Sequence, residues 1–222
     1  MAIKASDVKT LREMTGAGMM ACKKALTEAQ GDQEKAIELL RKKGLSAAAK
    51  KADRVAAEGT ITVKISEDNH KATITEINAE TDFVAKNENF KEFAKDTSAH
   101  IHSEDVSTVD ELHESTINGD KFSDYLSTQI AKIGENIVVQ RFHTLETDEN
   151  GCVGGYLHQN GRVGVIVAAE CDSPATSKAT AEALKDVAMH AAAMNPQYLN
   201  PEAIPAEEIA KEEEIAKEQL KK

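Results

Sequence analysis

The sequence predicts an α+β protein, with a helical N-terminal head, a core of two related hairpin-plus-helix subdomains and a C-terminal helical segment. Three observations lead to this prediction. Apolar residues recur at helical spacing over residues 6–51. After Gly59 the spacing changes to the alternation that is typical of strands. A hairpin followed by a helix is then expected twice, once in each half of the remaining chain.

Three or four short helices are expected over residues 6–51. Gly16 and Gly18 interrupt the first pair, and Gly31 precedes Asp32, which is suited to cap the next helix. Helices this short are marginal alone and must pack against one another. Their apolar stripes are Val8, Leu11 and Met14; Cys22, Ala25, Leu26 and Ala29; and Ala36, Ile37 and Leu40.

The first core unit follows a linker, residues 45–57, that is either helical or flexible. Ile61, Val63 and Ile65 share one face of a strand, residues 66–70 form a polar turn, and residues 72–79 return as a second strand. Two helices should follow. Their apolar faces are Phe90, Phe93, Ala94, Thr97 and Ile101 in one, and Phe122, Tyr125, Leu126, Ile130 and Ile133 in the other.

The second core unit repeats this order after a strand at residues 137–144. A hairpin is predicted over residues 153–169 with its turn at Asn160-Gly161. A helix then begins at Ser173-Pro174 and ends before Pro196. Its expected buried residues are Leu184, Val187, Ala188 and Ala191.

From Pro201 onward the chain is highly charged, which indicates a solvent-exposed helix or one half of a helical hairpin. Ile209, Ala216 and Leu220 form its sparse apolar stripe. The predicted divisions are residues 1–54 for the head with its linker, 55–140 and 141–200 for the two core subdomains, and 201–222 for the helical, coiled-coil segment.

Charge and composition favour a protein partner. The chain has 222 residues, a net charge of −11, only 4% aromatic residues and no Trp. Residues 1–57 carry a net charge of +5, and residues 58–222 carry −16. Few aromatic residues weigh against a sugar or single-strand binder, and an acidic body repels nucleic acid and acidic membrane surfaces.

The sequence also predicts a reduced, cytoplasmic protein. Its three cysteines have no CxxC spacing, so neither a disulfide framework nor a zinc site is expected. Cys22 lies within a helical stripe and is expected to be a core thiol. The N-terminus lacks a signal-peptide pattern, and no apolar run approaches the ~20 residues of a membrane span.

No motif for catalysis or nucleotide binding is found: the sequence contains no Walker loop, GxGxxG after a strand, GxSxG or HExxH. We therefore expect no enzyme activity, no cofactor, no metal and no direct nucleotide binding. His100 and His102, with Glu104 and Asp105, leave open a weak metal cluster, and with it a metal-dependent hydrolase. A solvated surface turn is the alternative for these four residues.

The segment that links the first hairpin to its helix, residues 79–86, is unusual because it carries Phe83 and Val84. Connecting segments run over the surface and normally shed large apolar groups. Two interpretations stay open. The two side chains tuck under the sheet, or they form a wedge that enters a pocket in a partner, as interface anchors do.

Three separated motifs resemble those of the bacterial elongation factor Ts family, the exchange factors for the GTPase elongation factor Tu. Residues 81–86, Thr-Asp-Phe-Val-Ala-Lys, are similar to the family's signature loop. Residues 15–26 resemble its N-terminal signature, and residues 132–136, Lys-Ile-Gly-Glu-Asn, its mid-chain motif. The resemblance implies a ubiquitin-associated-like three-helix head, two related α+β subdomains and a helical hairpin.

The resemblance also implies a function: the protein binds elongation factor Tu with GDP and promotes GDP release by disturbing the magnesium and phosphate site, after which GTP rebinds. The residues that would disturb this site are Asp82, Phe83, Val84 and Ala85. Further partner contacts are expected at Lys9, Arg12, Met19, Met20, Lys23, Lys24, Ile133, Gly134, Glu135, Asn136 and His158. For the lysines, solubility is an equal alternative, and a lone histidine such as His158 is more often an ordinary surface residue.

Members of the family's common bacterial type continue beyond the point that corresponds to Lys222 and return to complete the second subdomain. A truncated form or a naturally short one would explain this difference, and homodimerisation stays open. A rival interpretation is a ubiquitin-type adaptor in which the head alone is active; Phe83 would then have no role.

Overall fold

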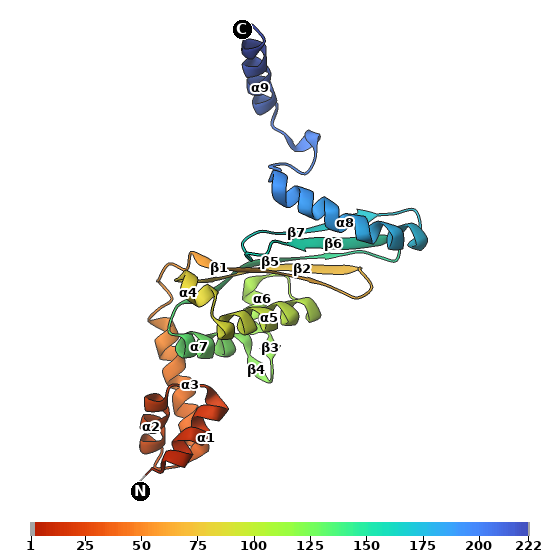
Figure 1. Ribbon diagram of the computed structural model, residues 1–222. Coiled ribbons are helices and arrows are strands. Elements are labelled where there is room, and N and C mark those ends of the chain that lie inside the picture. Colours follow the sequence, from red (N-terminus) through yellow and green to blue (C-terminus); the bar gives the residue numbers. More distant parts are fainter. Residues whose placement is uncertain (1–2, 222) are drawn as a thin grey trace.

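The computed structural model describes residues 3–221, so the ends of the predicted divisions, residues 1–2 and 222, lie outside the described residues. Its layers follow one another along an elongated molecule, from the head to a C-terminal helix that projects from the opposite end (Figure 1). Within the described residues, every helix is too short or too polar to cross a membrane. The mixture of helices and sheets confirms the α+β class.

The head contains three helices: α1 (Ala5–Thr15), α2 (Met19–Glu28) and α3 (Gln33–Ala49). Gly16 ends α1 in the left-handed conformation, at φ 65°, and the Asp32 side chain accepts a hydrogen bond from the Lys35 N–H at 3.1 Å. Both predicted breaks are therefore confirmed. The buried residues of the head are Val8, Leu11, Cys22, Ala25, Leu26, Ala29 and Ala36.

One expectation about the head needs correction, and one open alternative is decided for the start of the linker. Met14 is 62% exposed, so the elements packed on α1 cover Val8 and Leu11 of the predicted stripe but not Met14. The predicted linker is helical at its start, since α3 runs to Ala49 and its C-terminal half packs on the core helix α7 (Phe122–Ile133). Arg41 of α3 also forms ion pairs with Asp120 at 2.7 Å and Asp124 at 2.9 Å.

The first sheet has the order β1 (Glu58–Ile65), β2 (Lys71–Ala79), β5 (Ile137–Glu146), and all pairs are antiparallel. The predicted first hairpin and the strand at residues 137–144 are thereby confirmed. β5 crosses the boundary predicted at residue 140. The division into subdomains stays a prediction.

Helices α5 (Glu88–Ser103), α6 (Val109–Glu114) and α7 cover one face of this sheet (Figure 1). The predicted apolar faces of α5 and α7 lie in the main core. The largest fully buried side chains there are Phe90, Phe93, Ile101, Leu112, Phe122, Ile77, Ile137 and Val139. The sequence did not predict α6 or the two-residue strands β3 (Thr116–Ile117) and β4 (Asp120–Lys121), which are too short to show a period.

A second antiparallel hairpin, β6 (Gly151–Leu157) and β7 (Gly164–Glu170), packs between the first sheet and α8 (Pro174–Met194) (Figure 1). Two glycines of β6 allow this close packing because they have no side chain. A Cβ at Gly155 would lie 2.9 Å from Val63 of β1, and one at Gly154 would lie 2.4 Å from the Leu184 Cβ of α8. The hairpin-then-helix order thus occurs twice, whereas a relation between the two units stays a prediction.

Helix α8 begins as predicted, with the Ser173 hydroxyl accepting from the Thr176 N–H at 3.3 Å, and ends before Asn195. Leu184 and Ala188 are buried as expected, but Val187 is 51% exposed. The expectation for Val187 was wrong because a hairpin of only two strands covers a narrow stripe of the helix.

The chain continues through a short 3₁₀ turn, η1 (Pro201–Ala203), into α9 (Ala206–Gln219), which stands clear of the other layers (Figure 1). Ile209 and Leu220, from its predicted apolar stripe, are 43% and 87% exposed. The predicted solvent-exposed helix is confirmed, and its place in a helical hairpin stays a prediction.

The two histidines of the weak metal cluster make internal hydrogen bonds. His100 is buried, and its Nε2 lies 2.7 Å from the Ser115 hydroxyl, which itself donates to the Leu112 carbonyl. His100 therefore donates from Nε2. His102 lies 2.9 Å from the Thr73 hydroxyl. Among residues 3–221, no three His, Cys, Asp or Glu side chains lie close enough together to hold a metal ion.

The stability of the protein should fall in mild acid because of His100. Burial lowers the pKa of His100, and Glu104 opposes this only in part. Below the unfolded-state pKa of about 6.5 the unfolded chain binds the proton more readily, so stability is lost as the pH falls through that value. We expect the urea midpoint to decrease from pH 7 to 5.5 and the decrease to be smaller in His100→Gln, which keeps a donor for Ser115. The exposed His190→Gln is the control, and equal slopes in wild type and His100→Gln would contradict this explanation.

Substituting Gly154 should destabilise the second hairpin. A methyl group in Gly154→Ala would force α8 away from β6, which costs about 1–3 kcal/mol in overpacked sites. Denaturant unfolding measures the loss. Gly44→Ala is the control, because its Cβ would lie 3.6 Å from the Ala131 Cβ, an ordinary contact, and alanine favours the helix. Equal stability of Gly154→Ala and wild type would contradict the packing described here.

Candidate functional site

The signature loop folds into a one-turn helix, α4 (Asp82–Ala85), between β2 and α5. Thr81 caps its start, because the Val84 N–H donates to the Thr81 hydroxyl at 3.3 Å. Asn87 caps the following helix in the same way, accepting from the Asn89 N–H at 2.9 Å. Two caps within seven residues fix the direction in which the loop points.

The sequence left open whether the apolar side chains of this loop are buried or exposed, and the structure shows one of each. Val84 and Ala85 are half-buried and pack against the main core. Phe83 is 83% exposed. The loop is therefore anchored through Val84 and Ala85, while the aromatic ring of Phe83 projects into solvent from a rigid support.

The mid-chain motif holds this loop in place. The Glu135 carboxylate accepts two hydrogen bonds from Thr81, one from the backbone N–H at 3.0 Å and one from the hydroxyl at 2.6 Å. In return, Glu80 accepts from the Asn136 N–H at 2.6 Å. Residues that are more than fifty positions apart thus fix each other across the end of the sheet, and the hydroxyl that caps α4 is itself oriented by Glu135.

The other residues of this motif have mainly internal contacts. Asn136 is buried, and its side-chain amide donates to the carbonyls of Arg54, at 2.8 Å, and Ala52. Gly134 ends α7 in the left-handed conformation, at φ 93°. Ile133 is half-buried against the core. A direct partner contact for residues 133–136 stays a prediction, and the structure adds that Glu135 and Asn136 support the loop.

Asp82 is ionised at neutral pH. A hydrogen bond from Lys86, at 2.7 Å, lowers the pKa of Asp82 most, and the positive charge of Arg162 also contributes to the lowering. Asp82 and Lys86 therefore form an ion pair along α4. The turn of the second hairpin lies near the signature loop, because Arg162 of this turn pairs with Glu58, which lies opposite Ala79 at the end of β2.

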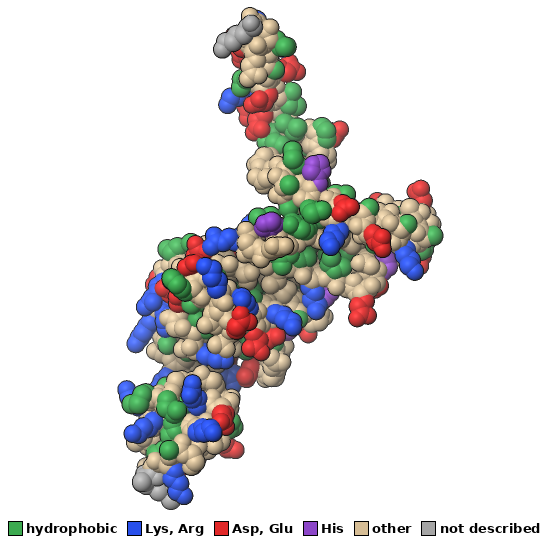
Figure 2. All heavy atoms as spheres, viewed as in Figure 1, with side chains coloured by type: hydrophobic (Ala, Val, Ile, Leu, Met, Phe, Trp, Pro, Cys, Tyr) green, Lys and Arg blue, Asp and Glu red, His purple; other side chains and the backbone are tan. Residues whose placement is uncertain are grey.

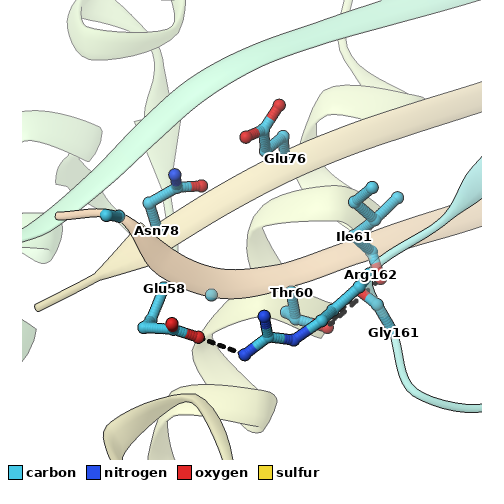
Figure 3. Close-up of a pocket in the computed structure, with 9 residues that line it drawn as sticks. Glu58, Thr60, Ile61, Glu76, Asn78, Gly161 and Arg162 are labelled. Carbon is cyan, nitrogen blue, oxygen red and sulfur yellow. Dashed lines mark hydrogen bonds and ion pairs between the residues drawn. The ribbon is translucent and has the colours of Figure 1, made fainter. Parts of the chain in front are cut away.

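A pocket of about 180 Å³ lies where this turn meets the start of β1 (Figure 3). Arg162 extends along it to an ion pair with Glu58. The Gly161 carbonyl accepts a hydrogen bond from the Ile61 N–H at 2.7 Å. No motif in the sequence indicated Glu58 or Arg162, because their pairing joins residues 104 positions apart.

The head exposes the predicted basic residues. Lys23 and Lys24 line a groove on α2 together with Met20, which is 64% exposed, and Met19 is 48% exposed beside them. Lys9 and Arg12 are exposed on α1. Figure 2 shows Lys and Arg side chains spread over the head. The structure thus offers a surface of methionines and lysines that is suited to an acidic, amphipathic helix.

His158 follows β6 and is exposed. Its ring Nδ1 lies 2.8 Å from the Tyr156 hydroxyl, and its backbone N–H donates to the Val163 carbonyl at 2.9 Å. The tyrosine fixes the orientation of the ring and leaves Nε2 free to contact a partner. His158 belongs to the same turn that contacts β1 through Gly161.

Replacing Glu135 should loosen α4 while the fold is kept. In Glu135→Gln the side-chain amide offers one acceptor oxygen to two Thr81 donors, so one hydrogen bond is lost at a cost of about 1–3 kcal/mol. We expect faster amide hydrogen exchange at Val84. Glu114→Gln, at an exposed ion pair with Lys121, is the control. Unchanged exchange at Val84 would contradict the role of Glu135 in support of the loop.

Comparison with known proteins identifies relatives over most of the chain. The family model described as "Elongation factor TS" matches residues 80–222. Proteins named elongation factor Ts from Campylobacter curvus and Campylobacter concisus are 56% and 58% identical over 193 residues, which are 87% of this chain and 54% of each relative. One from Nitratiruptor sp. is 58% identical over 193 residues, which are 63% of the length of that relative. The chain therefore spans little more than half the length of these relatives.

Proposed function

Because the chain belongs to the elongation factor Ts family, we propose that it is a translation elongation factor that binds elongation factor Tu with GDP and promotes release of the nucleotide. The observation that carries the proposal is the exposure of Phe83, at 83%, on a helix turn whose neighbouring residues are anchored in the core. An exposed aromatic ring on a rigid support costs little conformational entropy when it enters a partner's pocket.

The proposed mechanism is displacement without bond making. Phe83 enters a pocket that opens only when helices of the GTPase shift away from its magnesium and phosphate site. The binding energy of the ring then differs between the two states of the GTPase, which is the condition for a shift of the equilibrium. Val84 and Ala85 keep the helix turn seated, and Asp82 is held beside Lys86.

Phe83 cannot release the nucleotide alone. Burial of one Phe contributes about 1.5–3 kcal/mol, whereas a nucleotide held at nanomolar affinity corresponds to about 12 kcal/mol. The remaining energy must come from wider contacts. The methionine and lysine surface of α2 and the ring of His158 are the proposed contacts, and Glu135 and Asn136 act through the loop that they support.

Linkage makes the effect reciprocal. If the protein weakens GDP binding by some factor, GDP weakens binding of the protein by the same factor. GTP in cellular excess can therefore displace the protein and complete the cycle. The chain itself needs no catalytic residue and no cofactor for this function, because the bound nucleotide and its magnesium belong to the GTPase.

Release of a fluorescent GDP analogue from purified elongation factor Tu tests the proposal. We expect the wild-type chain to accelerate GDP release. The acceleration by Phe83→Ala should be about 10- to 100-fold smaller, which corresponds to the burial energy of one aromatic ring. Leu199→Ala, which removes another exposed apolar side chain, is the control and should equal wild type. No acceleration by the wild-type chain would refute the function, and equal acceleration by wild type and Phe83→Ala would refute the role of Phe83.

A further inference from the structure

The turn of the second hairpin is docked on the edge of the first sheet beside the signature loop. β1 is an edge strand of the sheet. Its Ile61 N–H donates to the Gly161 carbonyl at 2.7 Å, so the turn covers part of that edge. Gly161 has φ +67°, and a Cβ there would lie 2.7 Å from the Thr60 hydroxyl oxygen, so the contact requires glycine at this position.

Arg162 connects three parts of this region. Its guanidinium pairs with Glu58 at the start of β1 (Figure 3), and its backbone N–H donates to the Asn160 side chain at 3.0 Å, within the turn. Its positive charge also reaches Asp82 of α4, where it adds to the stronger effect of Lys86 on the pKa. Glu58 lies opposite Ala79, three residues before Asp82, so the pair of Glu58 and Arg162 connects the turn that carries His158 to the end of the sheet from which α4 begins.

We propose that Arg162 is a positioning residue that locks the turn of the second hairpin against β1, so that His158 and Phe83 meet the GTPase as one rigid surface. This inference rests on the proposed exchange function. Two contacts on one rigid support bind more tightly than two contacts that move independently, because the second contact forms at a high effective concentration. A loosened turn would weaken binding while Phe83 itself, on its separately anchored helix, is kept.

The ion pair with Glu58 contributes little to folding, which makes Arg162 suitable for mutation. Its side chain is 57% exposed and that of Glu58 is 33% exposed, and exposed ion pairs add little stability. The strand pairing of β6 with β7 does not involve the Arg162 side chain. Arg162→Ala should therefore fold, with a turn that detaches from β1 more often.

The test is a comparison of Arg162→Ala with wild type at increasing concentrations of the chain, in the GDP-release assay. For the variant we expect the concentration that gives half-maximal acceleration to rise on the order of fivefold, the scale of a modest coupling between two sites, and the maximal rate to stay within about twofold. Arg162→Lys keeps the charge and should restore part of the loss. Amide hydrogen exchange at Ile61 should become faster in Arg162→Ala, which reports directly on detachment of the turn.

Arg141→Ala is the matched control, because Arg141 is an exposed arginine paired with Glu76 on the same sheet, at 2.7 Å. It should match wild type in both assays. The inference would be overturned if exchange at Ile61 became faster in Arg162→Ala while the half-maximal concentration stayed the same. The turn would then detach without weakening the binding of the chain to the GTPase. A fall only in the maximal rate would overturn it as well. If the wild-type chain itself does not accelerate release, the proposed function is refuted. That result differs from the two results for Arg162→Ala that would overturn only the role of Arg162.

Discussion

The Glu135 carboxylate accepts both hydrogen bonds that Thr81 can donate, and the geometry of the signature loop depends on this contact. The contact orients the hydroxyl that caps α4, and α4 in turn directs Phe83 outward while Val84 and Ala85 remain on the core. A carboxylate that accepts two hydrogen bonds forms a stronger and more directional contact than a neutral group can.

The same arrangement explains why the mid-chain motif and the signature loop belong together. Asn136 donates its N–H to Glu80 and its side-chain amide to carbonyls of residues 52 and 54, where the head joins the core. One buried amide thus connects the linker, the end of β2 and the end of α7. A buried polar network of this kind is favourable only when each of its groups is paired, which makes its geometry specific.

The head is also held at a defined place on the core. The C-terminal half of α3 packs on α7, and Arg41 pairs with two aspartates. The exposed surface of Met20, Lys23 and Lys24 therefore has a fixed relation to the signature loop. Because exposed ion pairs contribute little energy, the helix packing carries most of this restraint.

Much of the fold could be predicted from the sequence because its signals are local. The helical stripes of α5 and α7, the Asn160-Gly161 turn and the caps at Asp32 and Ser173 were all identified correctly. Expected burial failed at Met14 and Val187, because the period of a stripe does not show how much of it the neighbouring elements cover. The elements α4, α6, β3 and β4 were missed because a few residues cannot show a period.

The sequence by itself determined the chemical identity of the candidate site: an aromatic residue in a connecting segment, a basic head and three motifs in order. It left open whether Phe83 and Val84 are buried or presented. Only the tertiary structure separated them, because the direction of a one-turn helix depends on Glu135, which is 54 residues away. Contacts such as those of Glu135 with Thr81 and of Arg162 with Glu58 leave no local pattern, since they exist only after distant segments have folded together.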